Sequence, residues 1–341
     1  MGLPENRWVN LTAKYQKGER NKITDVPGVT VGHVTVDDPA RDIHTGVTAI
    51  LPHRGNLFKD KVAAGLAVIN GFGKSAGLVQ VQELGTVESP VIMTNTFSVG
   101  TAVNAVIRYM LKDNEDIGVS TGTINCVVTE CNDGELNDIR GMHVTEDHVL
   151  KALANTGADF KEGAVGAGRG MCCMGIKGGI GSASRIVKIK DAEYTIGAIL
   201  MSNFGVLGNL RINGEKIETP VEDAKDRDRG SVIIVLATDL PLTSRQLCRV
   251  ARRSAVGLGR TGSYLGNGSG DIAIAFSTAN RVPHYSQTGI NEIRMVHDEC
   301  LDPVFEATAE VVEEAVISSL YHAETVKGIR GKTLHGLLEF L

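Results

Sequence analysis

No stretch of this sequence is apolar over the roughly 20 residues that a membrane-spanning helix needs. The longest apolar run, Val232 to Ala237, has the length of a buried strand. The chain opens Met1-Gly-Leu-Pro-Glu-Asn-Arg7 and therefore shows no apolar core of a secretory signal. Its six cysteines include no Cys-x-x-Cys pair, which fits reduced thiols. We expect a cytoplasmic protein with no membrane role.

An excess of positive charge and a metal-ligand spacing are also missing. The net charge of −5 and the pI near 6.0 argue against a nucleic-acid partner, because such proteins normally carry a basic surface. The nine histidines include no His-Glu-x-x-His motif, and His143 and His148 are five residues apart, off a common helical face. We expect no metal and no other cofactor.

What is present is an ordinary globular composition, with 42% hydrophobic and 22% charged residues. The apolar spacing predicts helices over 99–111, 148–156, 243–258 and 303–320, and strands over 23–52, 61–69, 91–93, 186–202, 231–238 and 271–276. Strands and helices are mixed without a regular βαβ alternation. The charged segment 213–230 contains few apolar residues, and we expect a mobile surface linker there.

Two glycine-rich segments resemble nucleotide-binding loops without their context. Gly71-Phe-Gly-Lys-Ser75 would need a glycine where Val68 stands. The segment 163–185 leads into a strand rather than a helix, unlike a dinucleotide fingerprint. Such glycines equally suit a loop whose amides surround a carbonyl oxygen, or a tight turn.

The segment Gly266-Asn-Gly-Ser-Gly270 carries the most informative serine. A hydrolase nucleophile elbow would place serine third, between a strand and a helix, whereas here Ser269 is fourth and precedes a predicted strand. A serine in this position fits an N-terminal nucleophile exposed by cleavage after Gly268, whose missing Cβ leaves the backbone accessible. The freed α-amine, with an ordinary pKa near 7.7 to 8.0, can act as the base for its own hydroxyl. Taken alone, the local sequence also fits an ordinary turn.

Segments along nearly the whole chain match the segments of one known family, and these matches support the catalytic interpretation. They include Ile23-Thr-Asp-Val-Pro-Gly-Val-Thr-Val-Gly-His33, Asn70-Gly-Phe-Gly-Lys74, Asn132-Asp-Gly134, Lys177-Gly-Gly-Ile-Gly-Ser182, Asn203-Phe-Gly205 and Gly268-Ser-Gly-Asp271. In these segments and their order the chain resembles the family of the L-aminopeptidase/D-amino-acid esterase DmpA and the β-peptidyl aminopeptidases.

The resemblance implies an α/β fold, a four-layer αββα sandwich similar to that of N-terminal-nucleophile hydrolases. It also implies one domain over 1–341, cut between Gly268 and Ser269 into a large piece, 1–268, and a small piece, 269–341. The resemblance further implies that the protein forms a homotetramer of such pairs. Members of the family release N-terminal residues from peptides, amino-acid amides or esters without a metal.

The same resemblance implies roles for individual residues. Ser269 matches the nucleophile, and Asn203 matches an asparagine that stabilises the tetrahedral oxyanion, a task suited to an amide N–H. Lys177 matches a lysine near the site, where a cation would lower the pKa of the Ser269 amine or contact the leaving group. A solvated loop lysine is the alternative for Lys177. Leu136 stands in place of a tyrosine that lines the oxyanion site, so a backbone N–H is an alternative second donor.

Three carboxylates on the last predicted helix complete the expected site. Glu310, Glu313 and Glu314 share one helical face, and we expect this face to approach Ser269 and bind the substrate amine. Relatives carry a hydroxyl or an acid two residues before the second glutamate of the pair, where this chain has Val312. That departure breaks a serine relay, so Glu314 is expected to act alone.

Two alternatives stay open at this stage. On the same fold, a pantetheine-type amidase or a nylon-oligomer hydrolase is associated with a threonine nucleophile, and Ser269 favours the aminopeptidases. The other alternative is a non-catalytic small-molecule-binding protein that has kept the fold.

Overall fold

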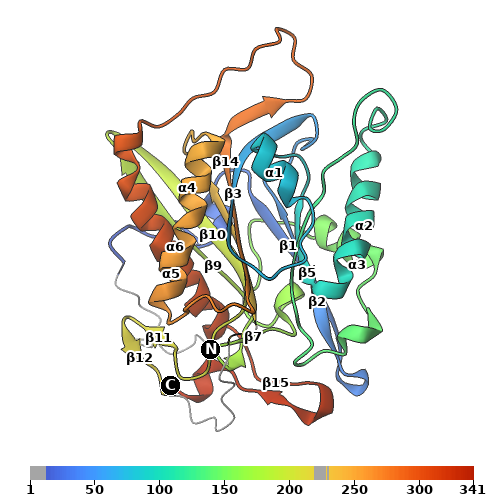
Figure 1. Ribbon diagram of the computed structural model, residues 1–341, viewed down its shortest axis with the longest axis vertical. Coiled ribbons are helices and arrows are strands. Elements are labelled where there is room, and N and C mark those ends of the chain that lie inside the picture. The colour runs from blue at the N-terminus through green and yellow to red at the C-terminus, as the bar shows by residue number, and fades with distance from the viewer. Residues whose placement is uncertain (1–12, 219–227, 229) are drawn as a thin grey trace.

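Two β-sheets packed face to face form the centre of the molecule in the computed structural model, which describes residues 13–218, 228 and 230–341 (Figure 1). The first sheet has the order β1-β2-β5-β6, with β1 (Thr30–Asp38), β2 (Ile43–Leu51), β5 (Val91–Asn95) and β6 (Val127–Cys131). The second has the order β4-β3-β14-β13-β10-β9, with β3 (Asp60–Gly71), β4 (Thr86–Val87), β9 (Ile180–Ile189), β10 (Ala192–Asn203), β13 (Ser231–Thr238) and β14 (Gly270–Pro283).

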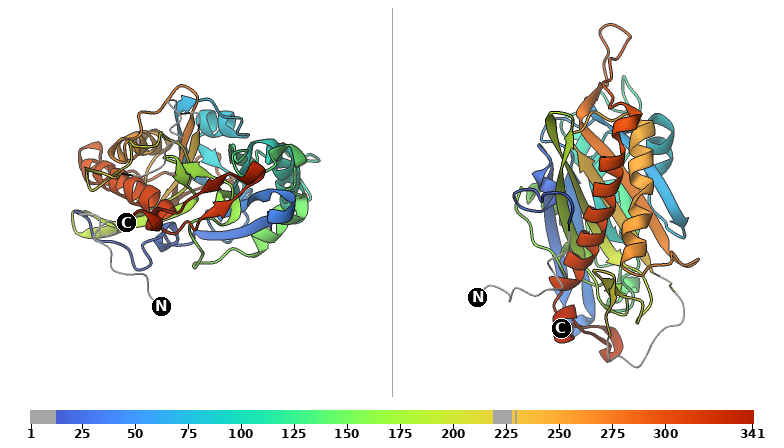
Figure 2. Two further views of the ribbon diagram at one scale, coloured as in Figure 1. Left: turned by 90° about the horizontal axis from the view of Figure 1, so that it is seen from below. Right: turned by 90° about the vertical axis from the view of Figure 1, so that its left-hand side faces the viewer.

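Helices cover the outer face of each sheet (Figures 1 and 2). The first sheet is covered by α2 (Val99–Leu111) and α3 (Glu146–Ala154), and the second by α4 (Ser244–Arg252), α5 (Ser254–Arg260) and α6 (Asp302–Tyr321). Three apolar cores fill the spaces between the four layers, one between the sheets and one under each helical layer. The expected αββα sandwich is confirmed.

Strands that are buried on both faces form the middle of the second sheet. All eight residues of β13 are buried, as the unbroken apolar run predicted. β13 pairs in parallel with β14, and β14 pairs on its other side with β3 in antiparallel fashion. Because β14 lies between two neighbours, the residues at its start are held in a fixed position.

The helices follow local signals. Thr243 caps α4 by accepting the N–H of Gln246, and α6 carries proline in its first turn, where no intrahelical donor is lost. α6 lies directly on β9 because Gly181 has no side chain there: a Cβ would stand 1.9 Å from the Ala315 carbonyl oxygen. The predicted helix 243–258 is interrupted at Arg253, between α4 and α5.

Smaller elements close the two ends of the sandwich. They are α1 (Leu78–Leu84), β7 (Cys172–Cys173), β8 (Ile176–Lys177), β11 (Arg211–Ile212), β12 (Glu215–Lys216), β15 (Val326–Lys327) and β16 (Thr333–Leu334). β11 and β12 form a small hairpin at the start of the predicted linker 213–230, and Ile217 after it is buried. The rest of that linker, apart from 228 and 230, lies outside the described residues.

One row of paired residues positions the candidate site. Asn203 at the end of β10 pairs with Ser231, and Ser231 pairs with Gly270 at the start of β14. Gly270 in turn pairs with Gly71 of β3. With neighbouring strands about 4.8 Å apart, Asn203 and the residue after Ser269 lie two strands apart at the same end of the sheet.

Candidate active site

Ser269 closes a tight turn immediately before β14. Its N–H donates to the carbonyl oxygen of Gly266 at 2.9 Å, so the turn runs over Gly266-Asn-Gly-Ser269. Asn267 at its tip is exposed, whereas Ser269 is fully buried. Leu265, just before the turn, has a φ of 57°, a left-handed conformation that is costly for a residue with a bulky side chain. The backbone entering the turn is therefore strained.

Asn70 of β3 holds this turn from the side. Its Nδ2 donates to the carbonyl oxygens of Gly266 at 2.9 Å and Asn267 at 3.3 Å, and it also contacts that of Ser269. The N–H of Phe72 donates to the Ser269 carbonyl at 3.3 Å. Within the described residues, no hydrogen bond reaches the carbonyl of Gly268 itself. The carbonyls on both sides of Gly268 are fixed while that one stays available.

Asp228 joins the turn to two neighbouring loops. Its Oδ1 accepts the N–H groups of Gly205 at 3.0 Å and Gly230 at 3.3 Å, and its Oδ2 accepts that of Gly266 at 3.3 Å. The buried carboxylate therefore ties the Asn203-Phe-Gly205 segment to the turn that carries Ser269.

The hydroxyl of Ser269 has a carboxylate partner. Ser269 Oγ donates to Asp271 Oδ1 at 2.5 Å, and Asp271 is only 1% exposed. Burial raises the pKa of Asp271 to about 6, the nearby negative charge of Asp228 adds to this, and the Ser269 hydrogen bond opposes it. A carboxyl in this condition can exchange a proton near neutral pH.

Asn203 lies in the same row of paired residues as Gly270, the residue after Ser269. Its Oδ1 accepts the N–H of Cys172 at 2.8 Å, and its Nδ2 donates to the carbonyl of Asn132 at 3.1 Å. These two bonds fix the orientation of the amide and leave one N–H of Nδ2 for another acceptor. Among the described residues, no hydrogen bond joins Asn203 to Ser269.

Lys177 is fully buried and its ammonium group faces backbone oxygens. Nζ donates to the carbonyls of Gly168 at 3.0 Å, Met171 at 2.8 Å and Gly178 at 2.6 Å. Burial lowers the pKa of Lys177 to about 7. The three bonds use all three donors of an ammonium group, so Lys177 joins the glycine-rich loops and is not the solvated lysine of the alternative interpretation.

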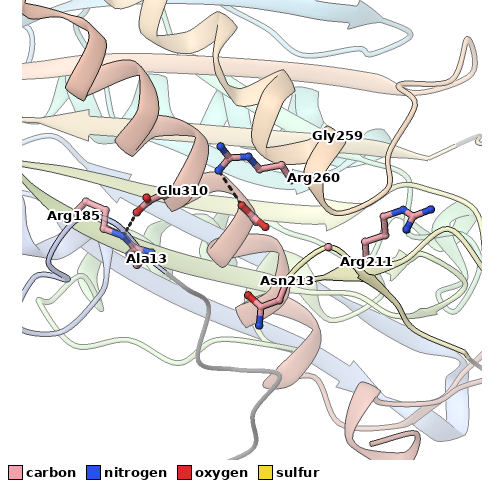
Figure 3. A pocket seen from close by; sticks show the side chains of 9 residues that line it. Ala13, Arg185, Arg211, Asn213, Gly259, Arg260 and Glu310 are labelled. Carbon is pink, nitrogen blue, oxygen red and sulfur yellow. Dashed lines mark hydrogen bonds and ion pairs between the residues drawn. The ribbon is translucent and has the colours of Figure 1, made fainter.

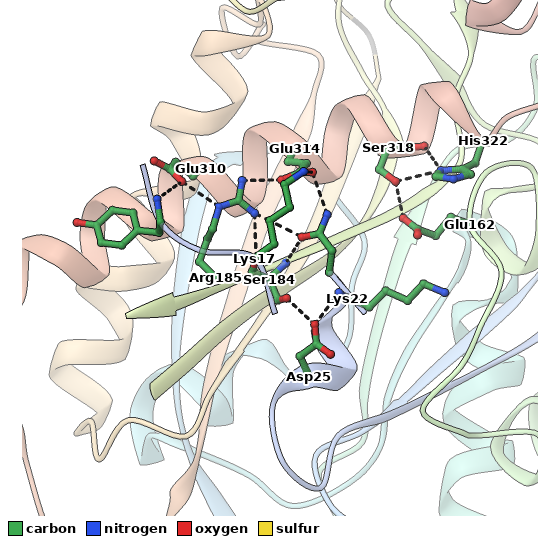
Figure 4. Close-up of polar contacts among 12 residues, drawn as sticks. Lys17, Lys22, Asp25, Glu162, Ser184, Arg185, Glu310, Glu314, Ser318 and His322 are labelled. Carbon is green, nitrogen blue, oxygen red and sulfur yellow. Dashed lines mark hydrogen bonds and ion pairs between the residues drawn. The ribbon is translucent and has the colours of Figure 1, made fainter. Parts of the chain in front are cut away.

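The structure places Glu310 and Glu314 in a buried ion-pair network (Figure 4). Arg185 of β9 donates from Nε to Glu310 at 2.9 Å and from Nη2 to Glu314 at 2.5 Å. Glu314 also accepts from Lys17 at 2.5 Å. Burial alone would raise the pKa of Glu314, but Arg185 and Lys17 together lower it. Both carboxylates therefore already have cationic partners.

This network lies far along the sheet from Ser269. Arg185 pairs with Ile196, seven positions before Asn203 in β10. At about 3.3 Å per residue, the two rows are about 23 Å apart. The structure does not bring Glu310 and Glu314 to the serine.

Glu313 lines a separate pocket of about 530 Å³ between α5, α6 and the β11–β12 hairpin (Figure 3). It is paired with Arg260 at 3.1 Å. Burial raises the pKa of Glu313, and Arg260 opposes that change. Leu136 is fully buried beneath the small hairpin formed by β15 and β16, packed with Val326 and Leu334.

Another carboxylate, Glu130 at the end of β6, lies near the start of β14. It is 2% exposed, its Oε1 accepts the N–H of Lys74 at 2.8 Å, and its Oε2 accepts the Thr96 hydroxyl. A Cβ at Gly73 would stand 3.6 Å from Glu130 Oε1 and 3.9 Å from Cα of Gly270. Glu130 and the first residue of β14 therefore flank one glycine.

The sequence had given no role to Asn70, Asp228, Asp271 or Glu130. Asn70 and Asp271 belong to segments that match the family, and this match was the signal that could have identified them as site residues. Nothing local distinguishes Asp228 or Glu130 from other acids, because their partners come from distant parts of the chain.

No three His, Cys, Asp or Glu side chains within the described ranges are grouped so as to hold a metal ion. Across those same ranges, no helix is long and apolar enough to span a bilayer. All six cysteines lie in the described part of the chain, and each is a free thiol.

A two-sheet sandwich with a buried serine at the start of a central strand is the arrangement of an N-terminal-nucleophile hydrolase. The chain belongs to peptidase family S58, whose family model matches residues 21–334. It is a serine aminopeptidase or amidase, a hydrolase of peptide or amide substrates.

Similar proteins support this assignment. The β-peptidyl aminopeptidase BapA of Sphingosinicella microcystinivorans is 36% identical over 98% of this chain and 89% of its own length. The crystal structure of the PH0078 protein from Pyrococcus horikoshii OT3 has a TM-score of 0.91 at 51% identity, covering 96% of this chain and 94% of the other. The L-aminopeptidase D-Ala-esterase/amidase of Ochrobactrum anthropi, described as a prototype of the serine aminopeptidases, has a TM-score of 0.86 at 39% identity, with coverages of 96% and 94%.

Proposed function

We propose that this chain cuts itself between Gly268 and Ser269 and then releases N-terminal residues from peptides, amino-acid amides or esters. Ser269 is the nucleophile of both reactions. The pieces are 1–268 and 269–341. One observation carries the proposal: Asn70 holds the carbonyls on both sides of Gly268, while no hydrogen bond from the described residues reaches the Gly268 carbonyl. The Gly268 carbonyl oxygen is thus available for a donor that would stabilise attack by the neighbouring hydroxyl.

Hydrolysis by the mature enzyme follows from the residues at the end of the sheet. The α-amine of Ser269, freed by cleavage, takes the hydroxyl proton as Oγ attacks the substrate carbonyl. The Asn203 amide is fixed by Cys172 and Asn132, and its remaining N–H serves as an oxyanion donor. Losing one such donor typically costs about 10² to 10³ in kcat.

The substrate amine requires a negative partner near the nucleophile, and we assign this role to Glu130. Glu310, Glu313 and Glu314 are neutralised by arginine or lysine partners. Among the described residues, Glu130 accepts hydrogen bonds from two uncharged donors, the Lys74 N–H and the Thr96 hydroxyl. We therefore propose that this carboxylate pairs with a substrate ammonium group, and such a charged hydrogen bond contributes about 1.5 to 3 kcal/mol.

The two pieces are expected to stay together after cleavage. β14 belongs to the small piece, but both of its neighbours, β3 and β13, belong to the large piece. Separating the pieces would break two hydrogen-bonded strand edges in the middle of the sheet. We further propose a homotetramer of such pairs in the cytoplasm, in keeping with six free thiols.

The decisive experiment is a denaturing gel of freshly purified protein, followed by N-terminal sequencing of the smaller band. We expect two bands, the smaller beginning Ser-Gly-Asp-Ile-Ala. Ser269→Ala should remove both cleavage and hydrolysis. A single full-length band that persists on long incubation would rule out self-cleavage and favour the binding-protein alternative.

A further inference from the structure

Cleavage of the uncut chain needs a base that the mature enzyme does not need. Before the bond breaks, the nitrogen of Ser269 is an amide and cannot accept a proton, so another group must take the hydroxyl proton. In the uncut chain that base must lie within hydrogen-bonding distance of Ser269 Oγ, which is about 2.6 to 3.2 Å or slightly less.

Asp271 makes that contact. Its Oδ1 lies 2.5 Å from Ser269 Oγ and accepts a hydrogen bond from the hydroxyl. The two residues are two positions apart at the start of β14, a spacing that places side chains on one side of an extended chain. Asp271 Oδ2 is buried and, in the part of the chain that the structure describes, has no hydrogen-bond partner. Besides the backbone of Val232, the Ser269 hydroxyl is the group that hydrogen bonds to this carboxylate among the described residues.

Other acids at this end of the sheet are already engaged. Asp228 accepts three backbone N–H groups, and Glu130 accepts from Lys74 and Thr96. Asn70 acts as a donor to the turn. None of these side chains hydrogen bonds to Ser269 Oγ within the described residues, which leaves Asp271 as the acceptor.

We infer that Asp271 is the general base for cleavage of the Gly268–Ser269 bond, an inference that rests on the self-cleavage proposed above. Asp271 Oδ1 takes the hydroxyl proton while Ser269 Oγ forms a bond to the carbonyl carbon of Gly268. The C–N bond then breaks, and Asp271 returns the proton to the departing nitrogen. The product is an ester with a free α-amine. One water hydrolyses the ester, giving the Gly268 carboxylate and the Ser269 hydroxyl.

The environment of Asp271 suits this exchange. Facing it are Asp228 from the loop before β13 and Cys131 at the end of β6, while its pairing partners, Asn70 of β3 and Val232 of β13, carry no titratable group. Burial raises the pKa of Asp271 to about 6. The carboxylate is therefore ionised at neutral pH and basic enough to accept a proton.

The test follows cleavage of newly made chain. Full-length protein from cell-free synthesis is moved into buffers from about pH 5 to about pH 8, and conversion is timed by denaturing gel and intact mass. The wild-type rate should fall about tenfold per pH unit below the Asp271 pKa of about 6. Asp271→Asn should cleave at least about 100-fold more slowly at pH 7.5, in line with the usual contribution of a general base.

Asp133→Asn is the matched control. Asp133 is also buried, burial also raises its pKa to about 6, and it hydrogen bonds to Asn137 rather than to Ser269. This variant should keep the wild-type pH profile. Wild-type cleavage that is independent of pH between about 5 and 7 would overturn the assignment, even if Asp271→Asn failed to fold.

Hydroxylamine separates the steps, because it cleaves an ester but not the Gly268–Ser269 amide. Intact mass distinguishes this cut from one at Asn267–Gly268, an Asn–Gly bond that hydroxylamine can also cleave. Hydroxylamine should not restore cleavage of folded Asp271→Asn, since the ester does not form. Restoration to the wild-type rate would overturn the role of Asp271 in ester formation. Absence of any cut in the wild type would instead refute the proposed self-cleavage, whereas a cut at Gly268 that is indifferent to Asp271 refutes only the base.

Discussion

Arg185 Nη2 lies 2.5 Å from the Glu314 carboxylate, and the Arg185 side chain is completely buried. Arg185 belongs to β9, before Gly268, and Glu314 belongs to α6, after it. The same guanidinium bonds to Glu310 at 2.9 Å. If the chain is cut after Gly268, this buried network joins the two products.

We expect Arg185→Met to destabilise the protein by about 3 to 5 kcal/mol, because two buried carboxylates lose their main cation. Urea denaturation followed by circular dichroism measures this loss. Arg260→Met is the matched control: it removes an arginine whose side chain is 42% exposed and paired with Glu313, so it should cost no more than about 1 kcal/mol. Similar losses in both variants would contradict a stabilising role of the buried network of Arg185, Glu310 and Glu314.

The pH dependence of stability should reflect the same network. Because Arg185 and Lys17 hold the pKa of Glu314 below its ordinary value of 4.5, the ionised carboxylate stabilises the folded state above that pH. This stability is lost as the pH falls through the lowered pKa. In Arg185→Met the acid-side slope should be shallower than in the wild type.

Glu130→Gln should reduce recognition of a free substrate amine. We expect kcat/KM for an amino-acid p-nitroanilide with a free amine to fall at least about tenfold, equivalent to about 1.4 kcal/mol. The N-acetylated counterpart should change little. Steady-state kinetics on both substrates give the ratio. If Glu314→Gln produced the selective loss instead, the expectation from the sequence that α6 binds the amine would be right.

Lys177→Met should destabilise the fold by at least about 3 kcal/mol, because three buried carbonyls lose their donor. Lys177 also gives the folding stability a pH dependence of a defined sign. Since burial lowers the pKa of Lys177 from 10.5 to about 7, the unfolded chain binds more protons between these values, so this group makes stability rise with pH in that window. The rise should vanish in the variant. An altered pH optimum of hydrolysis with unchanged stability would instead support the electrostatic role expected from the sequence.

Excess chelator should leave hydrolysis unchanged, because the proposed reaction uses a serine, an α-amine and an amide N–H. The measurement is p-nitroanilide turnover before and after overnight dialysis against EDTA. A large loss that added zinc restores would require a metal site and a different mechanism.

Local patterns predicted much of the architecture. The apolar spacing predicted a helix over 99–111, the bounds of α2, and the unbroken apolar run gave the eight residues of β13. The interruption at Arg253 was missed because no proline or glycine marks it. There the guanidinium lies 3.9 Å from the Phe305 ring centroid, a contact with α6 that is not visible in the local sequence.

By itself, the sequence determined the turn with Ser269, the buried strand after it and the shared face of Glu310 and Glu314, because each depends on residues a few positions apart. Tertiary structure alone decided which distant residues contact these groups. Arg185 is 125 residues from Glu310, and Asn70 is 196 residues from Gly266. Such partners are set by strand register and by helix packing on the sheet. The carboxylates of α6 therefore meet a buried arginine, and the turn before Ser269 is held by an asparagine of β3.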